Sequence, residues 1–365
     1  MTRTSRTILL LAALLAIFPL SGFATPSEAI ILGKGTNLAH WLSQTRARSE
    51  KRHNFITEKD IAYIAELGFD HVRLPIDEEH MWDEQGNRDE GAFEILHNAI
   101  RWSLEHDLLI LVDLHILRSH HFNAEEKPLW TDPVEQERFI ELWRDLSAAM
   151  HDYPTDKLAY ELMNEPVADD PDEWNRLLAK AFAAVRALEP ERSIVIGSNL
   201  WQQAQTFDDL VVPDDDRIIL SYHFYEPFML THYGTSWNFM KDYSGPVHYP
   251  GPILSQAETD ALPEDQRKVV EDFLGRSFNR QVLVEMMEQP LRKAKELGMP
   301  LYCGEYGVFS AAPAADRERW LQDMLSIFEE HGVSSANWNY KSDQFGFVGL
   351  DGQPIEAVRD VLVAQ

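Results

Sequence analysis

The sequence has almost no cysteine, since Cys303 is the one cysteine among 365 residues. An intramolecular disulfide is therefore excluded, and so are metal or iron–sulfur sites built from several cysteine ligands. Basic residues are also scarce, with 33 Lys+Arg against 60 Asp+Glu and a formal net charge of −27. Nucleic acids and anionic membranes would repel such a chain, which argues against both as partners. An uncharged substrate meets no such repulsion.

Long hydrophobic runs are absent except at the N-terminus. There, Arg3 and Arg6 precede an apolar run over residues 8–20, and small residues follow up to Ala24. The run is shorter than the roughly 20 residues that span a bilayer, and the pattern is typical of a secretory signal peptide. We expect cleavage after Ala24, with Ala29 as the second choice. This predicts a bacterial protein, secreted or periplasmic and free of the membrane after cleavage, with residues 25–365 as the catalytic domain.

Beyond residue 30, short apolar runs alternate with longer helical patterns. Expected strands lie at 31–37, 69–75, 108–115, 157–163, 193–197, 217–222, 300–304 and 334–339. Expected helices lie at 57–67, 91–106, 133–150, 171–188, 271–297, 313–331 and 354–363. Eight strands with helices between most of them predict a single (β/α)8 TIM barrel. The surplus length predicts long loops at the C-terminal face of the strands, the longest at 225–271.

Polar and aromatic residues stand at the C-terminal ends of six of these strands. Active sites of such barrels lie at this end, and charged residues in apolar strands are costly unless paired or used. The residues are Arg73, Asp113, His115, Asn164, Glu165, His223, Tyr225, Glu305 and Trp338.

Two of these residues, Glu165 and Glu305, suit glycoside hydrolysis. That chemistry uses one protonated carboxyl group as the acid and one ionised carboxylate as the nucleophile. Arg73 would keep the nucleophile ionised, and Tyr225 could donate a hydrogen bond to it.

Seven segments in order, KGTNLAHWLSQ, HVRLP, DLH, MNEP, YHFY, GEYG and the Trp of the eighth strand, resemble glycoside hydrolase family 5, the cellulase family. The resemblance runs from about Gly35 to Tyr340. It implies a retaining enzyme without a metal or other cofactor. It implies that Glu165 is the acid/base, with His223 as its partner, and that Glu305 is the nucleophile, oriented by Arg73 and Tyr225. It also implies three sugar contacts: Asn164 to the 2-hydroxyl, His115 to the reacting sugar and Trp338 as the aromatic platform under it.

Some residues have no clear counterpart in that resemblance. His120 and His121 are equally compatible with a cleft lining and with a structural loop. Four tryptophans fall in loops near the top of the barrel: Trp41, Trp130, Trp201 and Trp237. We expect sugar rings to stack on some of them, with Trp41 and Trp237 as the candidates, and packing of the long loops is an equal alternative for each.

The sequence thus predicts a monomeric endo-β-1,4-glucanase acting on polysaccharide or oligosaccharide. Mannan, xylan-type, mixed-linkage and β-1,3-glucan substrates remain open alternatives, because loops that the sequence does not position decide between them. A metal-dependent barrel hydrolase using His115, His120, His121 and His223 is a second class, which a chelator would reveal. A non-catalytic carbohydrate-binding barrel is a third, but it would require loss of a carboxylate, and both are present.

Overall fold

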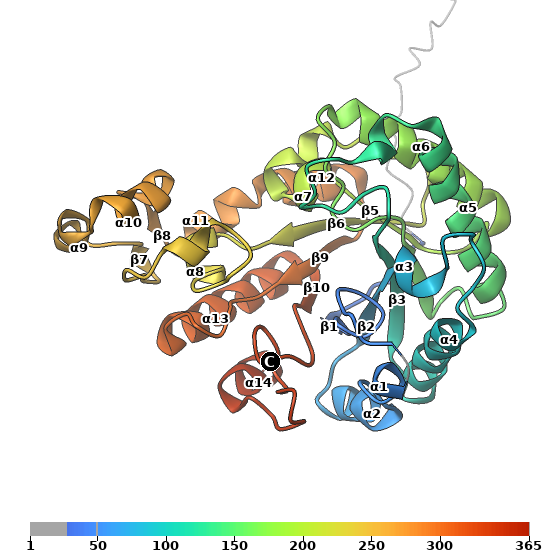
Figure 1. Ribbon diagram of the computed structural model, residues 1–365, viewed down its shortest axis with the longest axis horizontal. Helices are drawn as coiled ribbons and strands as arrows, with labels where there is room; N and C mark the ends of the chain where they lie inside the picture. The colour runs from blue at the N-terminus through green and yellow to red at the C-terminus, as the bar shows by residue number, and fades with distance from the viewer. Residues whose placement is uncertain (1–27, 49, 365) are drawn as a thin grey trace, which may run out of the picture.

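The computed structural model describes residues 28–48 and 50–364, and the predicted signal peptide at 1–24 lies outside this range. Within the described residues, eight parallel strands close into one barrel in the order β1–β10–β9–β6–β5–β4–β3–β2 (Figure 1). These strands are β1 (Lys34–Asn37), β2 (His71–Asp77), β3 (Leu109–Ile116), β4 (Leu158–Glu161), β5 (Ile194–Gly197), β6 (Ile218–Phe224), β9 (Leu301–Tyr306) and β10 (Ser334–Asn337). The predicted single (β/α)8 barrel is confirmed.

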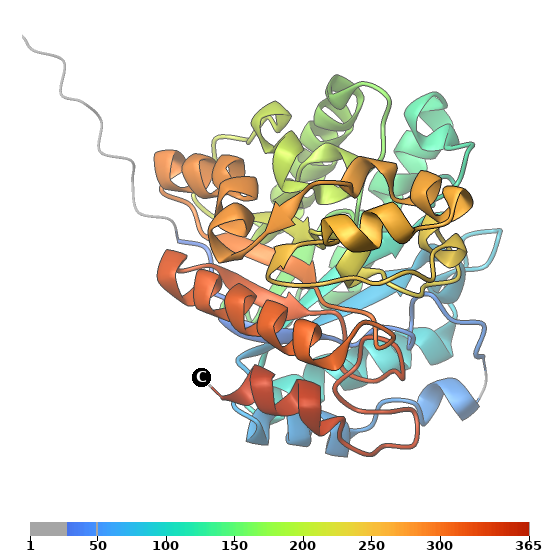
Figure 2. The same cartoon turned by 90° about the vertical axis from the view of Figure 1, so that its left-hand side faces the viewer.

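Helices surround the barrel (Figure 2). The longer ones are α2 (Glu58–Glu66), α4 (Glu90–Glu105), α5 (Pro133–Met150), α6 (Pro171–Leu188), α11 (Arg280–Met286), α12 (Glu288–Leu297), α13 (Ala314–His331) and α14 (Glu356–Val363). Short α-helices are α1 (Glu50–His53), α3 (Glu78–Met81), α7 (Asn199–Gln202), α8 (Phe228–Thr231), α9 (Gln256–Ala261) and α10 (Glu264–Val269). Short 3-10 helices are η1 (Pro128–Trp130), η2 (Ala204–Asp209), η3 (Phe239–Asp242) and η4 (Glu271–Phe273).

The helix expected over 271–297 is wrong in its first part. Residues 271–273 form η4, and Ser277–Phe278 form β8, which pairs antiparallel with β7 (Gly251–Pro252). The α-helix begins only after Asn279, whose side chain accepts a hydrogen bond from the Val282 backbone N–H and caps α11. Sequence periodicity missed the cap because the apolar spacing continues through it.

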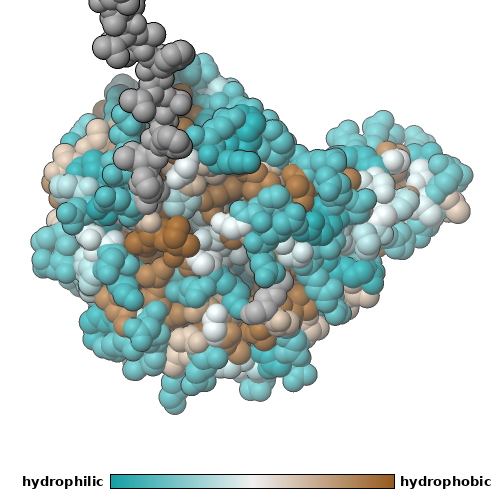
Figure 3. Space-filling view, turned by 180° about the vertical axis from the view of Figure 1, so that it is seen from behind, coloured by the Kyte–Doolittle hydropathy of each residue, from teal (hydrophilic) through white to brown (hydrophobic). Residues whose placement is uncertain are grey.

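The segment between β6 and α11 carries the longest departure from the barrel. It holds α8, η3, β7, α9, α10, η4 and β8, and α9 and α10 project to one side of the barrel (Figure 1). Seen from behind, this projection is covered mostly by hydrophilic residues, while hydrophobic residues gather over the central part of the face (Figure 3). The predicted long loop at 225–271 is therefore a small folded excursion.

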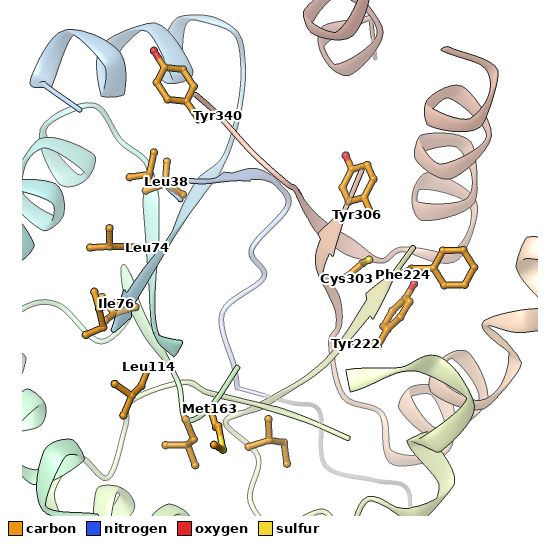
Figure 4. Packing of buried hydrophobic residues seen from close by; sticks show 14 of the residues in the cluster. Leu38, Leu74, Ile76, Leu114, Met163, Tyr222, Phe224, Cys303, Tyr306 and Tyr340 are labelled. Atoms are coloured by element: carbon orange, nitrogen blue, oxygen red, sulfur yellow. The ribbon is translucent and has the colours of Figure 1, made fainter. Parts of the chain in front are cut away.

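Side chains alternate between the two faces of each barrel strand, because successive residues of a strand point to opposite sides. In β3, Val112 and Leu114 join the large core between barrel and helices, which Figure 4 shows from close by. Leu111 faces inward and joins a separate interior cluster with Ala159, Val195, Ile219, Tyr302 and Ala336. Asp113 and His115 continue the inward face toward the C-terminal ends, above this apolar floor.

Candidate active site

Arg73 of β2 lies at the centre of the polar layer inside the barrel and is fully buried. Its Nε is 2.7 Å from Glu161 Oε2, its Nη2 is 2.9 Å from Asp113 Oδ2, and its Nη1 is 2.9 Å from Glu305 Oε1. It also donates to the side-chain oxygens of Asn37 and Asn164. One guanidinium therefore orients five side chains at the ends of four other strands, as its fixed fork of donors allows.

Glu305 near the end of β9 is held at both carboxylate oxygens. Arg73 donates to Oε1, and the Tyr225 hydroxyl donates to Oε2 over 3.0 Å. These two hydrogen bonds fix the orientation of the Glu305 carboxylate, and one of the two donors, Arg73, is positively charged. Such an environment favours the ionised form relative to a carboxyl group that lacks these partners.

Glu165 follows β4 and has a different environment. Its backbone is left-handed, with φ of 45°, which is uncommon for a residue other than glycine. Its Oε1 lies 2.9 Å from His223 Nδ1. Burial and the charge of Glu305 raise the pKa of Glu165 well above its ordinary range.

The two glutamates lie close enough to share a reacting centre. A carboxyl oxygen of Glu165 lies within 4.8 Å of one of Glu305. Burial also raises the pKa of Glu305, but Arg73 and the Tyr225 hydroxyl act in the opposite direction. The geometry therefore separates a carboxyl group that retains its proton, Glu165, from one that loses it first, Glu305.

Three further predicted residues lie around this pair. Asn164 is fully buried and donates no hydrogen bond from its Nδ2 among the described residues, so this amide is available to a bound molecule. His115 lies 2.7 Å from Asp113 through Nδ1, and its ring stacks on Trp338 with centroids 5.6 Å apart. Burial lowers the pKa of His115 to about 3, so it is neutral at ordinary pH.

A family model described as cellulase, glycosyl hydrolase family 5, matches residues 33–344. The chain belongs to this family. It is 32% identical over 326 residues to Endoglucanase C of Acetivibrio thermocellus, covering 88% of this chain and 94% of that protein. It is 30% identical over 305 residues to Cellodextrinase A of Ruminococcus flavefaciens, covering 82% and 83%. The crystal structure of endoglucanase Cel5A from Thermotoga maritima superposes with a TM-score of 0.71 at 25% identity, covering 91% and 97%. The protein is thus a glycosyl hydrolase.

Sequence reasoning missed two residues of this family 5 site, Glu161 and Gln202. Glu161 is fully buried on the inward face of β4, where it pairs in register with Asp113 of β3. The alternation of Ala159 and Glu161 on one strand face could have revealed it. Gln202 carries no such signal, because it lies in an irregular turn. Asn37 lies in the KGTNLAHWLSQ segment, but the resemblance of that segment does not predict its contact with Arg73.

The tryptophans divide into buried and exposed groups. The expectation that Trp41 binds sugar is wrong for this conformation, because its side chain is 1% exposed. Its indole donates to the Arg52 carbonyl and stacks on Trp102, so Trp41 is a core residue. Trp237 is 48% exposed and packs edge-on against Phe309, which in turn contacts Phe345.

Trp130 and Trp201 both lie near the segment that follows Glu165. Trp130 lines a surface hollow of about 400 Å³ together with Lys127 and Val167. Trp201 is 36% exposed, and its backbone N–H donates to the Pro166 carbonyl next to Glu165. The Trp130 side chain and the Trp201 backbone therefore lie next to residues 166–167.

The four histidines of the metal alternative do not form a cluster among the described residues. His120 is buried and accepts a hydrogen bond from the Val167 N–H, whereas His121 is exposed and accepts from the Asn123 N–H. In the described part of the chain, the group with metal-like spacing is Glu165, His223 and Glu305. The positive charge of Arg73, which lies 2.9 Å from Glu305, would repel a metal cation at this position.

Over the same described range, no helix is both long and apolar enough to cross a membrane.

Proposed function

We propose that this protein is a retaining endo-β-1,4-glucanase that acts by double displacement, with Glu165 as acid/base and Glu305 as nucleophile. The observation that carries the proposal is the pair of carboxyl groups within 4.8 Å in unlike environments. Retaining glycosidases have carboxyl groups about 5–5.5 Å apart, whereas inverting enzymes leave roughly 6.5–9.5 Å for a water molecule. The spacing here therefore favours retention.

In the first step, the Glu165 carboxyl group gives its proton to the glycosidic oxygen as the bond to the anomeric carbon breaks. A Glu305 oxygen attacks that carbon and forms a glycosyl ester. The negative charge of Glu305 disappears in this step, so the coulombic cause that keeps Glu165 protonated weakens. In the second step, ionised Glu165 takes a proton from water, which attacks the ester and releases Glu305 with the anomeric configuration retained.

Neighbouring groups have distinct supporting roles. Arg73 and Tyr225 hold Glu305 in the orientation for attack, and His223 orients Glu165. The free Nδ2 of Asn164 donates to the sugar 2-hydroxyl, and Trp338 and His115 form the wall against that sugar. Trp237 provides an exposed aromatic face for a more distant sugar.

The substrate proposal is supported by relatives named Endoglucanase C and Cellodextrinase A. We further propose export by the N-terminal segment and a monomeric enzyme without cofactor. Mannan, mixed-linkage glucan and β-1,3-glucan are the alternative substrates for the same mechanism.

Product release from carboxymethylcellulose, mixed-linkage glucan, β-1,3-glucan and mannan tests the proposal. Wild type is assayed beside Glu165→Gln and Glu305→Gln, with folding verified by circular dichroism. We expect cleavage of carboxymethylcellulose with an early fall in viscosity, the mark of internal cuts, and a loss of at least about 100-fold in both variants. Preference for another polymer would replace cellulose as the proposed substrate. Full activity in either variant would refute the assignment of the glutamates.

A further inference from the structure

The turn after β5 contains three consecutive left-handed residues that are not glycine. The φ angles of Leu200, Trp201 and Gln202 are 53°, 62° and 53°. Each such residue is disfavoured, so three in succession persist only when surrounding contacts hold them. The turn directs Gln202 into the barrel, where it is fully buried, while Trp201 remains exposed.

The Gln202 amide makes two buried hydrogen bonds that together fix its orientation. Its Oε1 accepts from the backbone N–H of Glu165 over 3.2 Å, and its Nε2 donates to Glu161 Oε1 over 3.2 Å. A backbone N–H requires an acceptor and a carboxylate requires a donor, so a flipped amide would break both bonds. Gln202 thus joins the backbone of Glu165 to the Glu161 carboxylate.

The second oxygen of Glu161 continues this connection. It accepts from Arg73 Nε over 2.7 Å, and Arg73 Nη1 donates to Glu305. The backbone of one catalytic glutamate is thereby linked, through Gln202, Glu161 and Arg73, to the carboxylate of the other.

Space for the amide comes from Gly197 at the end of β5. A Cβ added at this glycine would lie 2.0 Å from Gln202 Nε2, so any larger residue would displace the amide. Glu165 itself needs the support, because its own backbone is left-handed and its N–H would otherwise be unpaired next to a buried acid.

We propose that Gln202 is a positioning residue that holds the left-handed backbone of Glu165, so that the Glu165 carboxyl group lies in line with the leaving oxygen. This inference rests on the proposed function. It assigns to Gln202 an effect on proton donation to the leaving group, since its direct bond is to Glu165 and its path to Glu305 runs through two further side chains.

Two substrates with different leaving groups separate this role from a general loss of packing. Cellotetraose needs protonation of its leaving oxygen, whereas 2,4-dinitrophenyl cellobioside has a leaving group that departs without it. For Gln202→Leu, we expect kcat/KM on cellotetraose to fall roughly 10- to 100-fold, the size of effect that misplacing a catalytic group produces. On the dinitrophenyl substrate, kcat/KM stays within about threefold, because acid assistance contributes little to that step. Gln205→Leu, an exposed glutamine in the same segment, is the matched control and retains wild-type values on both.

Gly197→Ala provides an independent perturbation that leaves Gln202 in the sequence. It should give the same selective loss on cellotetraose, and Gly197→Ala combined with Gln202→Leu should be no worse than Gln202→Leu alone. Gln202→Glu serves if Gln202→Leu does not fold. It keeps the acceptor for Glu165 and becomes a donor to Glu161 only when protonated, so its cellotetraose activity should recover as the pH is lowered.

Equal losses on the two substrates would overturn the inference, because they would mean that Gln202 acts on Glu305 or on the fold as a whole. Wild-type behaviour of Gln202→Leu would overturn it as well. Both results are distinct from failure of the proposed function, in which wild type cleaves neither substrate or Glu165→Gln and Glu305→Gln remain active on cellotetraose.

Discussion

Removal of the Tyr225 hydroxyl tests how Glu305 is kept ionised. The hydroxyl donates to Glu305 Oε2 over 3.0 Å, and the ring packs edge-on against His232 and Phe345, so Tyr225→Phe should keep the ring in place. A hydrogen bond to a charged group is worth about 1.5–3 kcal/mol. Because one pKa unit corresponds to about 1.36 kcal/mol, the variant should raise the pKa of Glu305 by about one to two pH units.

The sign of the effect follows from the proposed role of Glu305 as the nucleophile. The nucleophile must be ionised, and a raised pKa keeps it protonated up to a higher pH. The acidic limb of the kcat/KM profile on cellotetraose should therefore move upward by about one to two pH units. Tyr233→Phe is the control, because that hydroxyl donates to the Gly245 carbonyl outside the site. An unchanged acidic limb in Tyr225→Phe would refute the argument that this hydroxyl stabilises the ionised nucleophile.

Three further outcomes follow from individual contacts. Arg73→Met leaves three carboxyl groups without their buried cation and should lower the free energy of unfolding by about 3–5 kcal/mol in urea titrations near neutral pH; an unchanged midpoint would contradict the central role of Arg73. Trp41→Ala should lower the free energy of unfolding by about 3–5 kcal/mol, because Trp41 is buried. Trp237→Ala should raise KM for long substrates with little change in melting temperature, because Trp237 is exposed. The reverse pattern would contradict the placement of these two tryptophans. Burial raises the pKa of Asp77 to about 7, so its ionised form destabilises the fold increasingly as the pH rises from about 4 through 7. Asp77→Asn should therefore be more stable than wild type, and by a larger margin at pH 8 than at pH 4.5. An equal gain at both pH values would disprove the raised pKa of Asp77.

Much of the fold was predictable because the barrel strands carry a strong local signal. Strand β3 reads as a nearly continuous apolar run that ends in Asp113 and His115, as a strand buried on both faces should. The excursion between β6 and α11 was not predictable in the same way. Its short helices and the β7–β8 pair have little local periodicity, and Tyr249 beside β7 is held by hydrogen bonds with Arg319 and Asp323 of the distant α13.

The candidate site shows the same division. Glu165 and Glu305 stand at the C-terminal ends of barrel strands, and this position in the sequence is enough to predict that they face the active site. Trp41 occupies a comparable loop but turns into the core, because its indole finds a carbonyl partner and a stacking partner there. Gln202 depends on three left-handed residues whose conformation no local pattern specifies, so only the folded chain reveals it.

The buried charges also bear on the working pH of the enzyme. Arg73 contacts Asp113, Glu161 and Glu305, so a single positive charge faces three acids in the barrel interior. Burial raises the pKa of Asp113 to about 7 and raises that of Glu161. Below neutral pH, a proton on Asp113 leaves more of the charge of Arg73 to Glu161 and Glu305. As the pH rises past 7, Asp113 ionises, competes for Arg73 and adds a negative charge near Glu305, which opposes ionisation of the nucleophile. The pH range in which Glu165 is protonated while Glu305 is ionised is therefore set by the whole cluster, and variants of Asp113 or Glu161 should shift it although neither residue takes part in bond exchange.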